Sequence, residues 1–516
     1  MSGPTIDPIS GTAEPQIGAR PVWSSDLAVL SYLAAATVIV HVIMGGRYGF
    51  QRDELATLDD ARHLAWGYVA YPPVTPFFGR LSLALFGTSL RGFRFFAGIA
   101  EAVTLVLTGL MARELGGRRW AQLVAAGAAL FFCLGAGALM QYVSFDYLAW
   151  VLVAYSTLRL LKSDNPRWWL AIGAGIGFGM LSKYAMPFLV TGLIAGLVFT
   201  DARRYLRSKW LWLGAVVALL VFLPNLVWQA QHNFISLDFL RHIHARDVGQ
   251  GRHNGFLFPG QLKLTQLAFP IWMAGLYFYL FSAAGKRYRA LGWMYIVPLT
   301  VFIVAKGRDY YVAGTYPMLY AAGAVCIECW FASLRSWLAI IVRVSIWTAL
   351  LIDAAIAMVF AVPTAPINSP WFKVAIQVNG DFREEIGWPE LVQTVAQIRD
   401  LLPPQDRAHL GILGTNYGEA GAVNLYGPEY GLPRAISGVN SFWYRGYGDP
   451  PPEVIIVLGL SRKVADEKFA SCVLAAHTWN RYGVKNEETE DHPNIYVCRN
   501  PREPWPLFWR HFQYYG

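Results

Sequence analysis

The stretch YGFQRDELATLDDARHLAWGYVAYPP, residues 48–73, follows the first long apolar segment, and the rest of the chain is organised around it. Near its start lie two adjacent carboxylates, Asp53 and Glu54. Apolar residues then recur at helical spacing opposite a charged face; they are Leu55, Leu58, Ala61 and Leu64, and the charged set is Asp59, Asp60, Arg62 and His63. The pattern is typical of an amphipathic helix lying along a membrane surface. We therefore expect interfacial helices within residues 50–80 and a reaction site at the bilayer edge.

The composition is that of a membrane protein. Of the 516 residues, 55% are hydrophobic and 15% are charged, whereas about a quarter of the residues in soluble proteins are charged. The apolar residues are concentrated in runs of about twenty, long enough to cross a bilayer as helices. Lys and Arg give a net charge of +9, but they cluster in short loops between these runs, which indicates membrane topology rather than a nucleic-acid partner.

The sequence predicts a polytopic α-helical protein with about eleven spans. The spans lie near residues 27–44, 95–113, 121–139 and 147–161, on both sides of Lys183, and near 211–228, 262–283, 289–305, 310–331 and 337–362. Residues 1–25 predict a short cytoplasmic tail. The membrane domain is therefore expected to cover residues 26–363.

Loop charges predict which side of the membrane each loop occupies. The densest basic loops alternate along the chain and should be cytoplasmic; they are 113–119, 162–167, 203–209 and 285–289. The opening stretch, Asp146, Lys183 and the loops 228–261 and 306–311 then share the other face. This distribution favours a site on the extracytoplasmic face, and we expect that face to be the periplasmic side of a bacterial inner membrane.

Residues 364–516 have no apolar run of spanning length and predict a periplasmic α/β domain. We expect helices over 391–402 and 461–476 and buried strands over 409–413 and 454–458. Cys472 and Cys498 both fall in this domain. An oxidising compartment permits a disulfide bond between them.

Several polar residues on the predicted periplasmic side are candidates for chemistry. Asp53 and Glu54 either mark a helix exit or supply a general base, and Asp146 begins a span on the same face. Lys183 either reaches toward the interface or binds an anionic headgroup. A cationic and aromatic cluster suited to phosphate follows, comprising Lys306, Arg308, Tyr310 and Tyr311.

Histidines in the 228–261 loop, including His232 and the pair His242 and His244, are a weak metal signal and also fit a solvated loop or a substrate contact. Four further charged residues lie inside or near the ends of spans; they are Glu101, Glu328, Arg343 and Asp353. The sequence leaves open whether they are functional or pair within the bundle.

A set of motifs occurs in a recognisable order. The motifs are FQRDE (50–54), HLAWGYVAYPPV (63–74), SFDYLAW (144–150), LSKY (181–184), NLVWQAQHNF (225–234), DYYVAGTYP (309–317), NYGEAGA (416–422) and GLP (431–433). Together they resemble the polyprenyl-phosphate-sugar-dependent membrane glycosyltransferases of the GT-C class. Within that class the sequence is most similar to the protein O-mannosyltransferase-like group, which includes the lipid A aminoarabinose transferase and the rhizobial lipopolysaccharide galacturonosyltransferases. Tyr71 departs from the histidine usual in the group.

The resemblance implies a GT-C fold and transfer of a sugar from a polyprenyl-phosphate donor to a hydroxyl of a lipid, a cell-envelope glycan or a protein. It implies that Asp53 is the general base of an inverting reaction, with Glu54 and Asp146 in the same site. The donor phosphate and substrate would contact Lys183, Tyr184, His232, Lys306, Arg308, Tyr310 and Tyr311. A divalent metal is left open, because the sequence contains no strong ligand set.

A transporter or flippase for a lipid-linked sugar is the alternative. Such a protein would be expected to contain inverted repeats and broken spans with charges at the midplane. The sequence contains no internal repeat, its candidate residues share one face, and a sizeable domain follows the last span. These features favour an enzyme, while the sugar, acceptor, lipid length and oligomeric state stay open.

Overall fold

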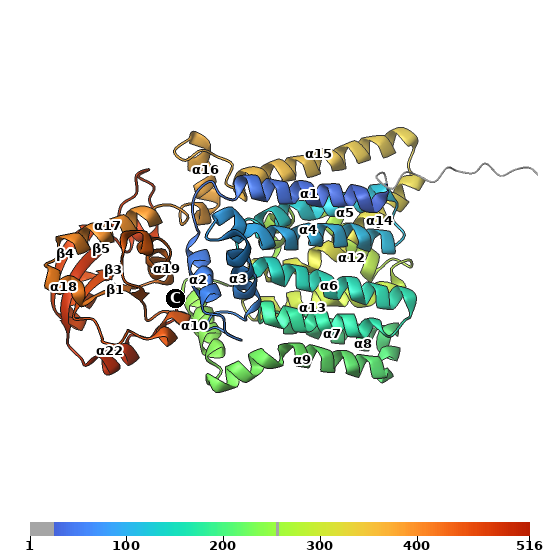
Figure 1. Ribbon diagram of the computed structural model, residues 1–516. Helices are drawn as coiled ribbons and strands as arrows, with labels where there is room; N and C mark the ends of the chain where they lie inside the picture. The colour runs from blue at the N-terminus through green and yellow to red at the C-terminus, as the bar shows by residue number, and fades with distance from the viewer. Residues whose placement is uncertain (1–24, 254–256) are drawn as a thin grey trace, which may run out of the picture.

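The computed structural model describes residues 25–253 and 257–516, so all of the predicted tail except Ser25 lies outside the described residues. Helices of the first part of the chain run side by side in a bundle, and the C-terminal part packs against one end of it (Figure 1). Eleven helices of this bundle coincide with the predicted spans; they are α1 (Asp26–Met44), α4 (Leu90–Glu114), α5 (Arg119–Ala136), α6 (Tyr142–Ser163), α7 (Trp168–Ser182), α8 (Met186–Phe199), α9 (Lys209–Gln231), α12 (Phe269–Leu280), α13 (Arg289–Val304), α14 (Tyr316–Trp330) and α15 (Ser336–Phe360).

Among the described residues, six helices are long and apolar enough to cross a membrane, or seven if the bent pair formed by α8 and Asp201–Arg207 is one span. Most of the others, such as the 15-residue α7, are shorter, whereas α6 has 22 residues but is not among the six. Eleven spans therefore remain a prediction. Glycines let some helices approach closely: a Cβ on Gly173 of α7 would lie 2.0 Å from the carbonyl oxygen of Gly214 on α9. Such small-residue contacts are common between membrane helices.

The C-terminal part contains a five-stranded sheet in the order β2-β1-β3-β5-β4. Its strands are β1 (Leu410–Gly414), β2 (Ala435–Ile436), β3 (Val454–Leu458), β4 (Phe469–His477) and β5 (Asn494–Pro501). Strands β1, β2 and β3 are parallel, β5 runs antiparallel to β3, and β4 runs antiparallel to β5. Every residue of β3 is buried, as its continuous Val-Ile-Ile-Val-Leu sequence predicts. The helices of the same part of the chain are α16 (Pro370–Val378), α17 (Trp388–Leu401), α18 (Pro404–Ala408), α19 (Tyr417–Tyr426), α20 (Arg462–Lys468), α21 (Glu487–Glu490) and α22 (Trp505–His511).

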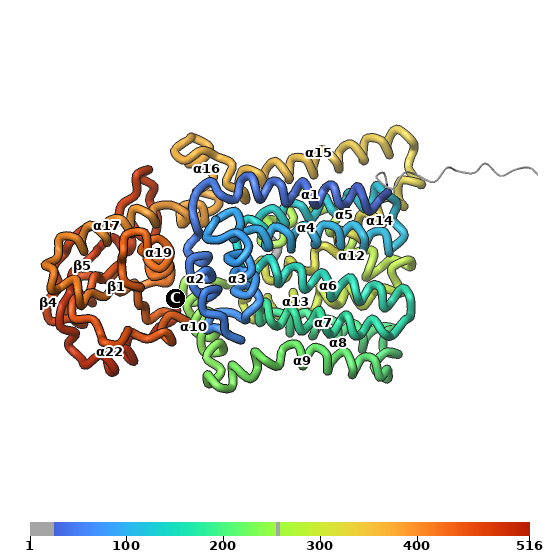
Figure 2. Tube along the Cα trace, in the orientation of Figure 1, coloured from blue at the N-terminus to red at the C-terminus, as the bar shows by residue number. Residues whose placement is uncertain are grey.

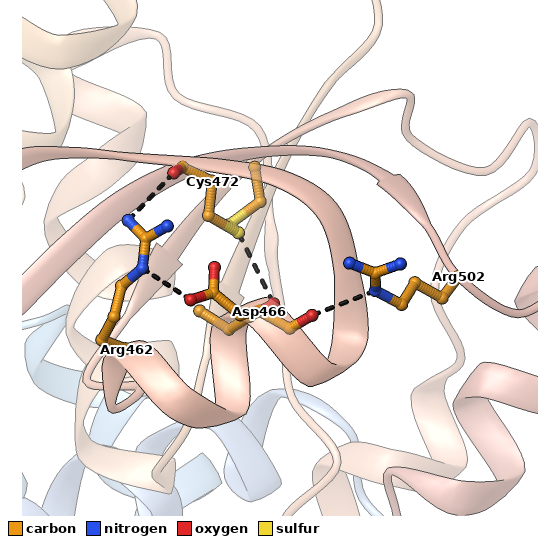
Figure 3. Close-up of a disulfide and its surroundings, with 6 residues drawn as sticks. Arg462, Asp466, Cys472 and Arg502 are labelled. Carbon is orange, nitrogen blue, oxygen red and sulfur yellow. Dashed lines mark hydrogen bonds and ion pairs between the residues drawn. A yellow bond between two sulfur atoms is a disulfide. The ribbon is translucent and has the colours of Figure 1, made fainter.

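The helix predicted over 461–476 is wrong beyond Lys468, where α20 ends and β4 begins. Strand β4 pairs with β5, and Cys472 lies directly opposite Cys498. The expected disulfide joins these two cysteines, close to the ion pair between Arg462 and Asp466 (Figure 3). Cross-strand pairing to a distant segment therefore overrides the local helical pattern.

Helix α2 (Arg52–Arg62) lies between the bundle and the C-terminal part, beside α3 (Val74–Phe86) and α10 (Ile235–Gly249) (Figures 1 and 2). Its apolar residues Leu55 and Leu58 are fully buried. The two carboxylates of its predicted charged face do not face water, because Asp59 and Asp60 are only 1% and 4% exposed. Helix α19 packs on α2 so closely that a Cβ on Gly421 would lie 2.8 Å from the Leu55 Cβ.

Candidate active site

A cavity of about 370 Å³ lies between the bundle and the C-terminal part. Five of the residues predicted to act on the donor or the acceptor line it: Asp53, Lys183, Tyr184, Arg308 and Tyr311. They come from α2, from the break between α7 and α8, and from the turn before α14. The shared face predicted from loop charges thus brings residues more than 250 positions apart to one cavity.

Asp53 is fixed by hydrogen bonds from both sides. Its Oδ1 accepts a hydrogen bond of 2.8 Å from the Tyr417 hydroxyl, and its Oδ2 accepts one of 3.2 Å from the Gln141 amide. Its backbone N–H donates to the Gln51 side chain, which caps α2. A half-buried carboxylate held in one orientation, with one edge in the cavity, suits a general base.

Glu54 points away from the cavity into a fully buried ion pair. Its carboxylate lies 2.6 Å from Arg94 Nη2 and also accepts hydrogen bonds from the backbone N–H groups of Gln51 and Met140. Arg94 in turn contacts Glu385, 3.1 Å away. Among the described residues, the cavity lining does not include Glu54. The geometry therefore favours a role for Glu54 in positioning α2 rather than in touching substrate.

Lys183 sits where the chain leaves α7 in an extended conformation. Its ammonium lies over the rings of Tyr142, Tyr310 and Tyr311, at 4.9, 4.9 and 4.4 Å from their centroids. Cation–π contacts of this kind stabilise a charge with few hydrogen-bonding partners. The cage holds the ammonium at the cavity wall, where it remains able to donate hydrogen bonds to an anion.

Three arginines line the cavity together with Lys183, and we call these four side chains the cationic wall. All three arginines contact Asp247 of α10. Arg308 Nη2 and Arg252 Nη1 lie 2.8 and 2.6 Å from its Oδ2, and Arg246 Nε lies 3.5 Å from its Oδ1. Burial would raise the pKa of Asp247, but the arginines outweigh it and lower that pKa. One carboxylate shared by three guanidinium groups leaves an excess of positive charge facing the cavity.

Other predicted site residues lie behind the cavity wall. Asp146 accepts a 3.0 Å hydrogen bond from Trp150 and is close enough to Lys183 to interact with its charge. Tyr310 contacts Lys183 from outside the lining, and His232 stacks on Trp228 with ring centroids 3.9 Å apart. Neither they nor Lys306 line the cavity, as far as the described residues show.

Asp60 is a cavity residue to which sequence reasoning gave no role. Its Oδ2 accepts a 2.6 Å hydrogen bond from Tyr71, and Arg445 of the C-terminal part forms an ion pair with both Asp59 and Asp60. Burial raises the pKa of Asp60 to about 6, although Arg445 and Tyr71 oppose the shift. Tyr71, which stands where the related motifs usually have histidine, therefore binds this carboxyl group.

The raised pKa of Asp60 predicts a pH effect on stability. The native state takes up a proton near pH 6 and the unfolded state only near 3.8, so native stability should increase as the pH falls from 7.5 to 5. We expect wild type to gain about 1 kcal/mol relative to Asp60→Asn over this interval. Thermal unfolding of both proteins at the two pH values measures it, and equal pH slopes would contradict the assignment.

The C-terminal part contributes its own residues to the cavity, which sequence reasoning missed; they are Tyr417, Asn440, Ser441, Phe442 and Gly516. Tyr417 lies within the motif NYGEAGA, so the sequence comparison included this residue but did not indicate its contact with Asp53. His244, Phe239 and Leu240 of α10 form another wall. The polar loop predicted at 228–261 is therefore largely helical.

Three of the four span residues left open have structural partners, whereas no hydrogen bond to either carboxylate oxygen of Glu101 is found among the described residues. Glu328 accepts hydrogen bonds from backbone N–H groups at the start of α5, and Asp353 accepts them from Leu267 and Ala268. Arg343 lies over the Phe331 ring, and Glu101 is fully buried beside Cys133. Within the described part of the chain, no group of three or more His, Cys, Asp or Glu side chains could hold a metal ion, so no metal site is assigned.

Comparisons with known proteins agree with the resemblance seen in the sequence. Residues 70–228 match a family model described as dolichyl-phosphate-mannose-protein mannosyltransferase. The lipopolysaccharide core galacturonosyltransferase RgtB of Rhizobium johnstonii is 29% identical over 221 residues, which are 41% of this chain and 43% of RgtB. The lipid A galacturonosyltransferase RgtD of the same organism is 28% identical over 39% of this chain and 44% of its own length. The chain thus spans less than half the length of the curated relatives it matches.

The fold is similar to that of a solved membrane protein. ArnT from Cupriavidus metallidurans, in its crystal structure bound to undecaprenyl phosphate, superposes with a TM-score of 0.58 over 91% of this chain and 97% of ArnT, at 13% identity. The chain therefore has a GT-C-type membrane fold, and the predicted resemblance to this group of glycosyltransferases is confirmed.

Proposed function

We propose that this chain is a membrane glycosyltransferase that moves a sugar from a polyprenyl-phosphate donor to a hydroxyl group of a lipid, a cell-envelope glycan such as lipopolysaccharide, or a protein. One observation carries the proposal. Asp53 lines the same cavity as four basic side chains, which are Lys183, Arg246, Arg252 and Arg308. A base and an anion-binding wall are what transfer from a sugar phosphate to a hydroxyl requires.

The cationic wall would bind the donor phosphate. Guanidinium groups can grip a phosphate through paired hydrogen bonds, and Lys183 supplies a compact charge beside them. The undecaprenyl phosphate in the ArnT crystal structure supports a donor of this chemical class. The phosphate monoester is itself a good leaving group, and the cations stabilise the charge that develops on it.

The reaction would then be a single displacement. The acceptor oxygen gives its proton to Asp53 and forms a bond to the anomeric carbon of the sugar. The bond between that carbon and the phosphate oxygen breaks, and the polyprenyl phosphate leaves with the electron pair. Attack opposite the leaving group inverts the anomeric centre, and holding both partners in one cavity lowers the entropic cost.

The arrangement of the helices supports an inner-membrane protein whose site faces the periplasm. The end of α4 and the start of α5, which flank the basic loop 113–119, lie at the end of the bundle away from the C-terminal part (Figure 1). Basic loops mark the cytoplasmic side. The disulfide between Cys472 and Cys498 fits an oxidising compartment at the other end.

Transfer by the purified protein tests the function. In nanodiscs, with a synthetic polyprenyl-phosphate sugar and an envelope glycolipid, we expect glycosylated acceptor and free polyprenyl phosphate in equal amounts by mass spectrometry. Lys183→Gln should raise the donor KM about tenfold or more, because a charged hydrogen bond to phosphate is lost. Lys209→Gln, at the start of α9, is the matched control. In liposomes, passage of the donor across the bilayer without any product would instead favour the flippase.

A further inference from the structure

A second cavity of about 370 Å³ lies within the C-terminal part, beside the beginnings of β1 and β2. Its size falls in the range of sites for small ligands, about 300–1,000 Å³. Phe442 lines both this cavity and the candidate active site. The two spaces therefore share Phe442 as a common wall.

The second cavity is lined by bases and aromatic rings. His409, Arg434 and Arg445 are among its lining residues, and its described lining contains no Asp or Glu. Asp449 and Glu453 flank the prolines 450–452 without forming part of that lining. A cavity of one charge sign attracts a ligand of the other, and the rings of Phe442 and Tyr447 offer flat apolar surface to a sugar.

The two arginines are held differently. Arg445 is buried against Phe442 and pairs with Asp59 and Asp60, which fixes its guanidinium between the two cavities. Arg434 Nη2 lies 3.9 Å from Asp59, beyond hydrogen-bonding distance, and its side chain is 46% exposed. Arg434 therefore keeps donors available to a bound anion, while Arg445 orients the surface around it.

We propose that this second cavity binds an anionic group, a phosphate or a carboxylate, on the glycan of the acceptor. This rests on the proposed function, in which the donor phosphate already occupies the wall around Lys183. An acceptor held by its anionic group at Arg434 would extend past Phe442 and present a hydroxyl to Asp53. The cavity thereby selects acidic glycans over neutral ones.

Direct binding tests the proposal without turnover. Full-length protein is titrated calorimetrically with a bisphosphorylated glucosamine disaccharide, a digalacturonic acid and the neutral disaccharide chitobiose. Arg434→Gln and His409→Gln should each weaken binding of an acidic disaccharide about tenfold or more. Arg462→Gln, an exposed arginine of the same domain paired with Asp466, should leave the affinity unchanged.

The two acidic probes distinguish phosphate from carboxylate as the recognised group. Binding of either probe more tightly than chitobiose supports the proposal. Chitobiose bound as tightly as both, or unchanged affinity in Arg434→Gln and His409→Gln, would overturn it. Lys183→Gln should impair sugar transfer but leave disaccharide binding intact. The calorimetric result therefore tests the second cavity independently of whether the protein transfers sugar. In transfer assays, Arg434→Gln should raise the KM for an acidic acceptor and leave the KM for the donor as it was.

Discussion

Replacing Asp53 by asparagine should lower the rate constant for sugar transfer at least a hundredfold, which corresponds to about 2.7 kcal/mol in the activation free energy. Asparagine has the same shape and can still accept the hydrogen bond from Tyr417. The amide of Gln141 can turn to match the new amide. The cavity therefore keeps its form, and what is lost is the group that takes the acceptor proton.

Steady-state kinetics distinguishes this loss from weaker binding. The kcat should fall while the donor KM changes little, because other side chains, Lys183 and the arginines, make the phosphate contacts. Asp238→Asn is the control, since Asp238 is an exposed carboxylate paired with Arg241 and is not among the residues described as lining the cavity. If Asp53→Asn turned over like wild type, Asp53 would not be the base.

The sequence predicts much of the bundle because each membrane helix leaves a local signal. Apolar runs and basic loops locate the helices to within a few residues, as for α1 and α15. Strand β4 shows the limit. Residues 469–477 become a strand only because β5, some twenty residues later, offers a pairing edge and a cysteine, and neither is visible in a local window.

The sequence predicts site residues correctly where membrane topology alone brings them to one face. It does not predict which side of a helix faces the cavity, or which side chains pair across long sequence distances. Asp53 and Glu54 are adjacent, so about 100° of helical rotation separates them. Only the position of Arg94, forty residues later, turns Glu54 inward and leaves Asp53 at the cavity. The partner of Asp59 and Asp60 is Arg445, nearly four hundred residues away, and no spacing rule connects them.

Arg94 joins four segments of the chain through one guanidinium. It donates to the carbonyl oxygens of Gly45 and Gly49 after α1, and it contacts the carboxylates of Glu54 on α2 and Glu385 before α17. Both acidic side chains and Arg94 itself are at most 2% exposed. This cluster fixes the direction in which α2 begins, and with it the position of Asp53.

Arg94→Met should therefore destabilise the protein by about 3–5 kcal/mol, because two carboxyl groups stay buried without a cation. Burial raises the pKa of Glu385 to about 7 even with Arg94 present. Without Arg94, protonation should relieve part of the loss, so the variant should be closest to wild type at low pH. Thermal unfolding in detergent across pH 5 to 8 measures the difference.

The triple variant Arg94→Met, Glu54→Gln, Glu385→Gln separates two effects of losing Arg94. One is the destabilisation by unpaired buried carboxylates, and the other is the loss of the contacts that position α2. Neutral amides remove the unpaired charges, so most of the stability should return, together with a flatter pH dependence. Sugar transfer should stay low, because α2 no longer has the contacts that aim Asp53. If the triple variant regained full transfer, the cluster would serve stability alone, and the position of Asp53 would have to be set by Tyr417 and Gln141.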